Sequence, residues 1–99
     1  KRSELIKERA TFTKPLKNKV EEYEEIIFKL EQQVDEANSM LIKASEEENS
    51  EEIQKYSKQL SHAQEGIDKA FEDLQDVSEK LEALEVEFEI KLEDLEKQK

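Results

Sequence analysis

The residues of this sequence that are best suited to a binding chemistry are the cations near its N-terminus. Residues 1–20 contain two anions, Glu4 and Glu8, and seven cations, which are Lys1, Arg2, Lys7, Arg9, Lys14, Lys17 and Lys19. Lysine and arginine contact phosphates whatever the base sequence, and the resulting affinity for nucleic acid falls steeply with salt. These seven residues are therefore the candidate nucleic-acid-binding site, although scattered surface cations with no partner would give the same composition.

Catalytic and metal-binding chemistry finds few suitable residues. The chain has no cysteine, and its single glycine, Gly66, excludes a glycine-rich phosphate-binding loop. His62, the only histidine, has Glu65 nearby, but a metal site needs further ligands. Paired carboxylates are abundant, yet acid–base catalysis also requires an enclosing pocket. We therefore predict that the chain is not an enzyme and has no catalytic, cofactor-binding or metal-binding residue.

The composition indicates long helices. Charged residues make up 43% of the 99 residues and hydrophobic residues 34%, with one glycine and one proline. Few turn residues and abundant Glu, Lys and Leu are typical of long helices and coiled coils, whereas intrinsic disorder is the competing explanation for so polar a chain. The spacing of the apolar residues must decide between the two.

Charge is distributed unevenly along the chain. The net charge is −11, and residues 1–20 contribute +5, so the remaining residues carry −16. The acidic part would repel phosphates, so any contact must be oriented, either with the basic arm and the base toward RNA or DNA or with the turn toward a basic protein.

The sequence contains no membrane-spanning or export signal. No apolar run approaches the roughly 18 residues that span a bilayer, and no signal-peptide pattern opens the chain. We therefore expect a cytoplasmic protein without a membrane partner. Because the chain begins at Lys1 rather than methionine, we also expect it to be one domain of a longer protein.

A first helix is predicted from about residue 15 to 45. Proline suits the first turn of a helix and disfavours helical geometry in the residue before it, so Pro15 predicts a helix start. Apolar residues then follow in alternating steps of four and three: Leu16, Val20, Tyr23, Ile27, Leu30, Val34, Ala37, Leu41 and Ala44. This spacing is typical of the contact seam of a coiled coil.

A turn is predicted at about residues 46–50. Three glutamates, Glu46 to Glu48, interrupt the apolar spacing. Asn49, followed three residues later by Glu52, resembles a capping box at the start of a new helix.

A second helix is predicted from about residue 50 to 96. Its apolar residues alternate in the same way: Ile53, Tyr56, Leu60, Ala63, Ile67, Ala70, Leu74, Val77, Leu81, Leu84 and Phe88. Gly66 lies within this series, either as a tolerated helix glycine or as a point of close approach by a partner backbone. Beyond Phe88 the spacing loosens, because Lys91 takes the next seam position while Leu92 and Leu95 continue nearby.

The two apolar series fit each other when the chain folds back at the turn. Residues whose numbers sum to 97 then face each other, from Ala44 with Ile53 to Leu16 with Leu81. No alanine meets another alanine, so large and small side chains alternate across the seam. Disorder does not explain this register. The register instead predicts an all-α fold, an antiparallel two-helix coiled-coil hairpin with a short basic N-terminal arm packing at its base.

The predicted domains are a basic linker or arm at residues 1–14 and the coiled-coil hairpin at residues 15–98. By these bounds the second helix is the longer one and projects past Pro15. We expect the arm, as a short helix or extended segment, to cover that end with Leu5, Ile6 and Phe12.

The N-terminal third of the chain carries a family resemblance. Its residues are Arg2-Ser3-Glu4, the run Lys14-Pro15-Leu16-Lys17-Asn18-Lys19-Val20-Glu21, and Glu24 through Leu30-Glu31. Together with the coiled-coil series and the acidic turn, they make the chain resemble the C-terminal domain of ABC-F proteins, soluble ATP-binding-cassette ATPases related to ABC transporters. The resemblance implies a cytoplasmic bacterial protein that engages the ribosome and influences translation. ATP and magnesium would be bound by other domains, with no cofactor in this chain.

These expectations combine into one function and one alternative. The function is a non-catalytic C-terminal interaction domain of an ABC-F ATPase, helping to position the parent on the ribosome or nucleic acid. Ribosomal RNA or DNA would contact the basic arm, the parent's ATPase domains would be intramolecular partners, and the domain would be monomeric. The alternative is a structural spacer or dimerisation coiled coil with no nucleic-acid role, associating through Ile26, Phe71 and the end near Phe88.

Overall fold

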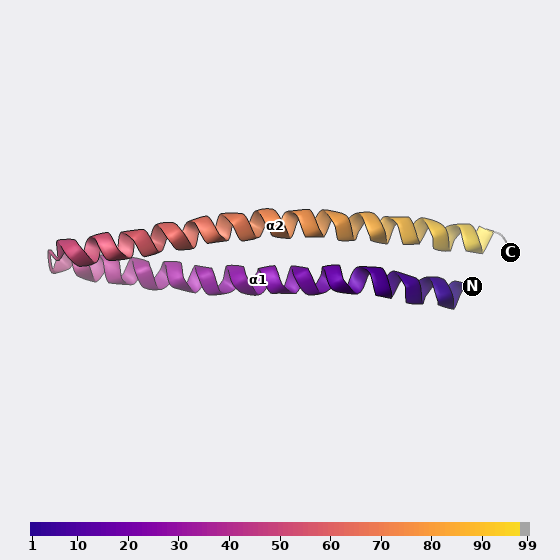
Figure 1. The fold of residues 1–99 in the computed structure, drawn as a ribbon, viewed down its shortest axis with the longest axis horizontal. Helices are drawn as coiled ribbons and strands as arrows, with labels where there is room; N and C mark the ends of the chain where they lie inside the picture. Colours follow the sequence, from indigo (N-terminus) through magenta and orange to yellow (C-terminus); the bar gives the residue numbers. More distant parts are fainter. Residues whose placement is uncertain (98–99) are drawn as a thin grey trace. The chain divides into compact units, whose positions relative to one another are not determined.

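The computed structural model describes residues 1–97 as two α-helices joined by a short turn (Figure 1). Helix α1 spans Arg2–Glu46 and helix α2 spans Ser50–Lys97. The two helices pack against each other, which confirms the predicted all-α hairpin. Neither helix, over the described residues, contains a stretch long and apolar enough to cross a membrane. Residue 98, the predicted end of the hairpin, lies outside the described residues.

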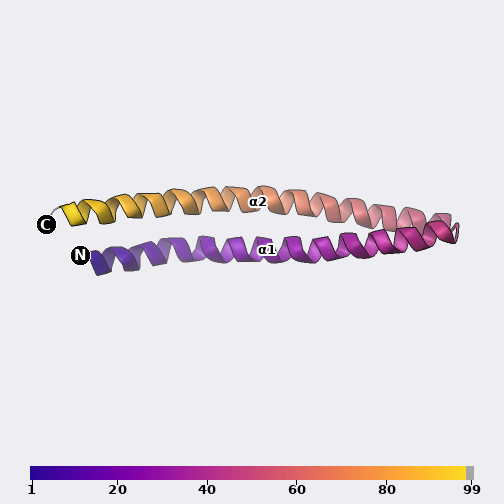
Figure 2. The same cartoon turned by 180° about the vertical axis from the view of Figure 1, so that it is seen from behind.

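The chain divides into two compact units. The base unit comprises Lys1–Glu22 together with the described part of Asp73–Lys99, and the turn unit comprises Tyr23–Glu72. Within each unit, a segment of α1 and a segment of α2 lie side by side in opposite directions, as the view from behind also shows (Figure 2). Each unit therefore brings together residues that are far apart in the sequence.

The core of the turn unit is the predicted seam. Its buried side chains are Ile27, Ala37, Ala44, Ala63 and Ala70. All five belong to the two apolar series, and the other seam residues of this unit are half-buried. The alanines leave room for the larger side chains between them, as the alternation of volumes across the seam predicts.

Helix α1 ends in a hydrogen-bonded cap that leads directly into α2. The Asn49 N–H donates to the Ala44 carbonyl at 2.9 Å and the Glu48 N–H to the Ser45 carbonyl at 3.2 Å, which are the two bonds of a Schellman motif. Glu48 takes the left-handed conformation that this motif requires, with φ at 56°. Asn49 caps α2 as predicted, because its Oδ1 accepts the Glu52 N–H at 3.2 Å. The Asn49 N–H serves α1 and so makes no reciprocal capping-box bond.

Helix α1 begins at Arg2, so the helix start predicted at Pro15 was wrong. Pro15 lies inside the helix, where it supplies no N–H to the carbonyl of Thr11. Both residues are exposed, so water can satisfy that carbonyl. The chain before the proline also packs on α2, since the Phe12 ring stacks on Phe88 with ring centroids 6.2 Å apart. This packing offsets the cost of the proline and holds the first fourteen residues against α2.

The N-terminal arm, residues 1–14, packs at the base as predicted, but almost all of it is a continuation of α1. Leu5 is half-buried, and Phe88, beneath Phe12, is only 2% exposed. Ile6 is exposed, so the prediction that it covers the end of α2 was wrong. The helices are of similar length, 45 and 48 residues, because α1 includes the arm.

The seam of the base unit changes its spacing at the same level in both helices. Its inward-facing residues are Leu16, Thr13, Arg9 and Leu5 on α1, and Leu81, Leu84, Phe88 and Leu92 on α2. Each series covers eleven residues in steps of three, four and four. An eleven-residue repeat locally unwinds the left-handed supercoil of heptad packing. Lys91 is consequently exposed, and the loosened spacing beyond Phe88 is a change of phase shared by both helices.

Candidate nucleic-acid interface

The seven predicted cations all lie in the N-terminal segment of the base unit, six of them within α1. They do not form one patch, because each residue turns the helix by about 100°. Lys7 and Lys14, seven residues apart, share one side of α1, and Lys17 lies next to them. Lys1 and Lys19, eighteen residues apart, lie on another side.

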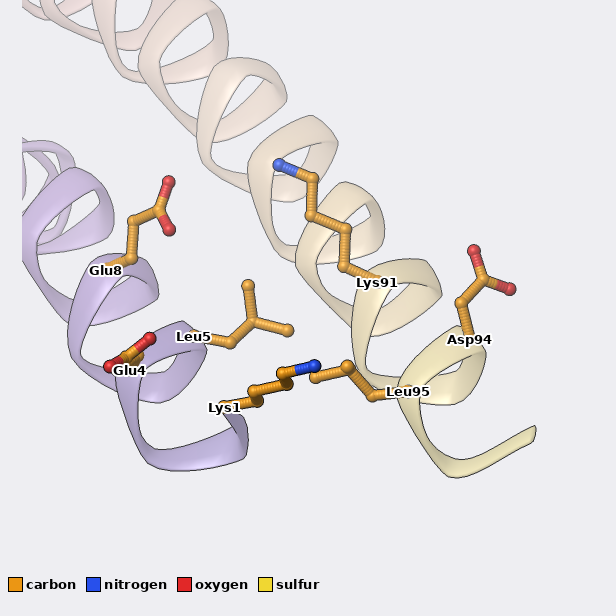
Figure 3. Close-up of a pocket in the computed structure, with 7 residues that line it drawn as sticks. All are labelled: Lys1, Glu4, Leu5, Glu8, Lys91, Asp94 and Leu95. Carbon is orange, nitrogen blue, oxygen red and sulfur yellow. The ribbon is translucent and has the colours of Figure 1, made fainter. Parts of the chain in front are cut away.

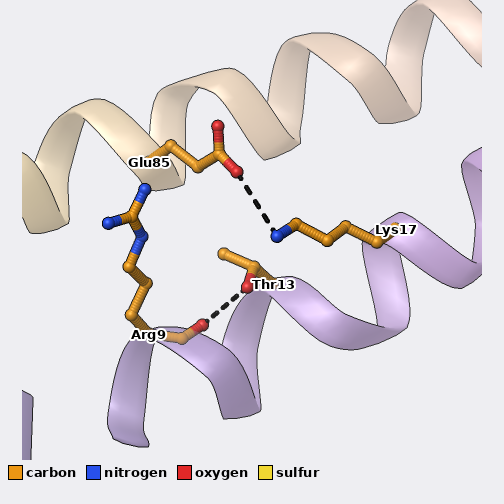
Figure 4. Close-up of polar contacts among 4 residues, drawn as sticks. All are labelled: Arg9, Thr13, Lys17 and Glu85. Carbon is orange, nitrogen blue, oxygen red and sulfur yellow. Dashed lines mark hydrogen bonds and ion pairs between the residues drawn. The ribbon is translucent and has the colours of Figure 1, made fainter. Parts of the chain in front are cut away.

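Two of the cations pair with carboxylates of α2. The Arg2 guanidinium lies 3.8 Å from the Glu96 carboxylate, and Lys17 Nζ lies 3.9 Å from Oε1 of Glu85 (Figure 4). Arg2, Glu96 and Lys17 are exposed and Glu85 is half-buried, so each pair contributes little to stability, about 0–1 kcal/mol. The carboxylates also disfavour binding, because a phosphate that approaches either cation meets an anion already beside it.

Lys19 and Lys1 also lie next to carboxylates. Lys19 Nζ is 3.8 Å from Glu22, one turn further along α1. Lys1 lines an open groove of about 390 Å³ at the end of the base unit (Figure 3). The groove is lined by Lys1, Glu4, Leu5, Glu8, Lys91, Asp94 and Leu95. Its three anions outnumber its two cations, so this end of the unit does not present a basic surface.

Arg9 belongs to the contact between the helices. It is half-buried at a seam position of the base unit. Its side chain and that of Lys17 extend toward α2 on the side where Glu85 lies (Figure 4). The aliphatic part of an arginine covers apolar surface in such a position. Arg9 is therefore a packing residue as well as a cation, which its place in the sequence did not reveal.

Lys7 and Lys14 lie on the side of α1 that faces away from its seam with α2. Both are exposed, and neither has an ion-pair partner within 4 Å among residues 1–97. About 10 Å of helix separates them, so they can contact two phosphates at once. The candidate interface thus narrows from seven residues to these two, with Lys17 beside them.

Sequence reasoning missed two features of this region. Thr13 is 2% exposed, and its hydroxyl donates to the Arg9 carbonyl at 2.8 Å, so a buried polar group finds its partner within its own helix (Figure 4). The second missed feature is the pairing of Arg2 and Lys17 with two carboxylates of α2, those of Glu96 and Glu85. Continuing the sum of 97 into the arm would have placed Thr13 opposite Leu84 and Arg9 opposite Phe88.

The lone histidine lies in the turn unit. His62 is exposed beside an open groove of about 570 Å³, whose other lining residues are Gln33, Glu36, Ala37, Met40, Tyr56 and Gln59. Within the described part of the chain, no three His, Asp or Glu side chains come together in a way that could hold a metal ion.

Comparison with models of known protein families, with curated proteins and with solved structures finds no match to this chain.

Proposed function

We propose that this chain is a non-catalytic interaction domain that contacts nucleic acid through exposed lysines of α1. In its specific form, the proposal is that the chain is the C-terminal domain of a cytoplasmic ABC-F ATPase and helps to position its parent on the ribosome. The observation that supports the contact is the pair Lys7 and Lys14, which are exposed and without carboxylate partners among the described residues. The specific form is supported by the sequence resemblance at residues 2–20.

The charge of the base unit determines how such a contact must be oriented. The α2 segment from Asp73 to Lys97 carries ten anions and three cations, so it repels phosphates. A nucleic acid must therefore approach α1 on the side of Lys7 and Lys14, away from α2. With two or three phosphates neutralised, the logarithm of the association constant should fall by about 2 to 3 per tenfold increase in salt.

The test is co-sedimentation of the chain with ribosomes, together with fluorescence anisotropy on single-stranded and double-stranded RNA and DNA. The variant Lys7→Gln/Lys14→Gln removes the two accessible cations. Its matched control is Lys58→Gln/Lys69→Gln, which removes two exposed lysines of the turn unit and changes the net charge equally. We expect the first variant to weaken binding about tenfold or more at low salt and the control to change it much less. Equal losses in both variants would show that only net charge matters.

The alternative, a dimerisation coiled coil, keeps one supporting observation. Ile26 and Phe71 in the turn unit are 44% and 52% exposed, so they are available to a second copy. Phe88 is buried and cannot contribute. Sedimentation equilibrium of the chain and of Ile26→Gln/Phe71→Gln decides this alternative: a monomer at all concentrations rules it out, and an association lost in the variant supports it.

A further inference from the structure

Helix α2 of the base unit has a second apolar face. Heptad positions c and f lie on the side of a coiled-coil helix that faces away from the seam and are normally polar. In the turn unit, α2 follows this rule, and its residues at these positions are Lys55, Lys58, His62, Glu65, Lys69 and Glu72. In the base unit three consecutive c and f positions of α2 are Ala83, Val86 and Ile90. A helix that is apolar on two opposite sides is expected to be covered on both.

The second apolar face is open in the structure. Val86 and Ile90 are 49% and 54% exposed, although α2 buries Phe88 on its other side. Ala83 and Val86 line a shallow hollow of about 450 Å³ together with Glu79 and Glu82. Side chains spaced at three and four residues offer the ridge and groove into which another helix packs.

The rim of this face is acidic. Glu82 and Glu89 lie along one edge and Asp94 along the other, where Lys80 also lies, with Glu79 and Glu93 at the two ends of the stripe. None of these five carboxylates has a cation within 4 Å among residues 1–97. The rim therefore repels nucleic acid and a second copy of the same acidic face, and it attracts cations placed beside an apolar stripe.

We propose that the outward face of α2 from Glu79 to Glu93 is a docking site for a basic amphipathic helix. The apolar side of that helix packs on Ala83, Val86 and Ile90, and its lysines or arginines lie over the glutamates of the rim. The stripe and its rim extend over about 21 Å, the length of four turns of helix. This site uses the other helix and the opposite charge from the proposed nucleic-acid contact, so each can fail without the other.

The probe is a fluorescein-labelled synthetic peptide of about 20 residues, long enough to form a helix on binding. It carries leucine at every third and fourth position and lysine or arginine beside the leucines. A scrambled peptide of the same composition has the same charge but no apolar stripe. Anisotropy titrations compare both peptides on the chain, on Val86→Gln/Ile90→Gln and on Phe28→Gln/Ile42→Gln. The last variant is a matched control, since it removes two similarly exposed apolar side chains from α1 of the turn unit.

We expect the amphipathic peptide to bind more tightly than the scrambled one. Val86→Gln/Ile90→Gln should weaken its binding about tenfold or more, and the control variant less than about twofold. Both targeted side chains are largely exposed, so the fold should persist, which circular dichroism checks. Amide chemical shifts on titration with the peptide should change along residues 79–93 and not in the turn unit. Lys7→Gln/Lys14→Gln should leave this binding intact.

Four results would overturn the proposal. Equal binding of the scrambled peptide would show attraction by charge alone. Unchanged binding after Val86→Gln/Ile90→Gln, or chemical-shift changes elsewhere, would remove the apolar face from the contact. Self-association of the chain that is lost in Val86→Gln/Ile90→Gln would make a second copy the occupant of this face.

Discussion

At Gly66, the side chain of Leu30 on α1 comes close to the backbone of α2 within the turn unit. A methyl group added at the Cα of Gly66 would lie 2.9 Å from Cδ1 of Leu30, well inside the ordinary carbon contact of about 3.5–4.0 Å. The sequence left two interpretations of this glycine, a tolerated helix residue or a point of approach for a partner's backbone. What approaches it in the structure is a side chain of the same molecule.

Gly66→Ala should therefore stabilise the chain by less than helix propensity alone implies. Alanine is better than glycine inside a helix by about 1 kcal/mol, but here the new methyl displaces Leu30 from a seam position. In the background Leu30→Ala that contact is absent, and the full gain should return. Urea unfolding of the four proteins, followed by circular dichroism, should give a coupling of about 0.5–1 kcal/mol. Additive effects would mean that Leu30 turns aside at no cost.

Residue types predicted where positive charge lies, but not which cations are accessible. Lys17 and Lys14 are equivalent in the sequence, yet only Lys17 meets a carboxylate of α2, Glu85. Arg9 is half-buried because the seam passes through it. Such differences depend on which side of a helix faces its neighbour, so the candidate site could be predicted only as a set of seven residues.

Each helix of the base unit changes phase by the same amount, and this keeps the two in register. Leu5 lies four positions before the seam residue Arg9 on α1, and Leu92 lies four positions after Phe88 on α2, where a heptad would step by three in each case. A change in only one helix would turn its apolar side away from the other. The matched steps keep both apolar sides in contact and place Lys91 in solvent.

The change of phase predicts which substitutions alter stability near the end of α2. Leu92→Ala should cost about 1–2 kcal/mol, below the usual range for a buried leucine because Leu92 is half-exposed. Lys91→Leu should give little or no stabilisation, since residue 91 is exposed in this packing. Urea midpoints at a fixed unfolding slope measure both effects. A large gain from Lys91→Leu would indicate that the heptad continues instead.

The heptad part of the fold was predictable because apolar residues occupy its seam positions. Among residues 1–97, six apolar side chains are buried, and all of them lie at predicted seam positions: Ile27, Ala37, Ala44, Ala63, Ala70 and Phe88. That the arm continues α1 without a break was not predictable from the apolar spacing, for two reasons. Pro15 has the sequence signature of a helix start although it lies inside α1. The seam before it contains Thr13 and Arg9, which a search for the spacing of apolar residues does not count.

Over the whole chain, we expect repulsion between like charges to outweigh the attraction within ion pairs. The net charge is −11, and the ion pairs found among the described residues join side chains that are 38–69% exposed. Exposed pairs of this kind contribute about 0–1 kcal/mol each. The excess of anions instead acts between many groups at once, over a screening distance of about 10 Å at 0.1 M salt.

Added salt should therefore stabilise this protein. Between about 10 mM and 500 mM sodium chloride, screening shortens the reach of the repulsion more than it weakens the few ion pairs, so the urea midpoint should rise. Glu82→Gln/Glu89→Gln removes two exposed anions that have no cation partner within 4 Å among residues 1–97. This variant should be more stable than the parent chain at low salt and nearly equal to it at high salt.

A urea midpoint that falls as salt is added would show that the ion pairs contribute more to stability than the repulsion removes. Glu82→Gln/Glu89→Gln would then give no gain in stability. The sign of the effect also bears on the binding experiments, because contact with a nucleic acid must weaken over the same range of salt. If stability rises while binding falls, the loss of binding cannot result from unfolding. The loss of binding then reports the release of counterions from phosphates that Lys7, Lys14 and Lys17 contact.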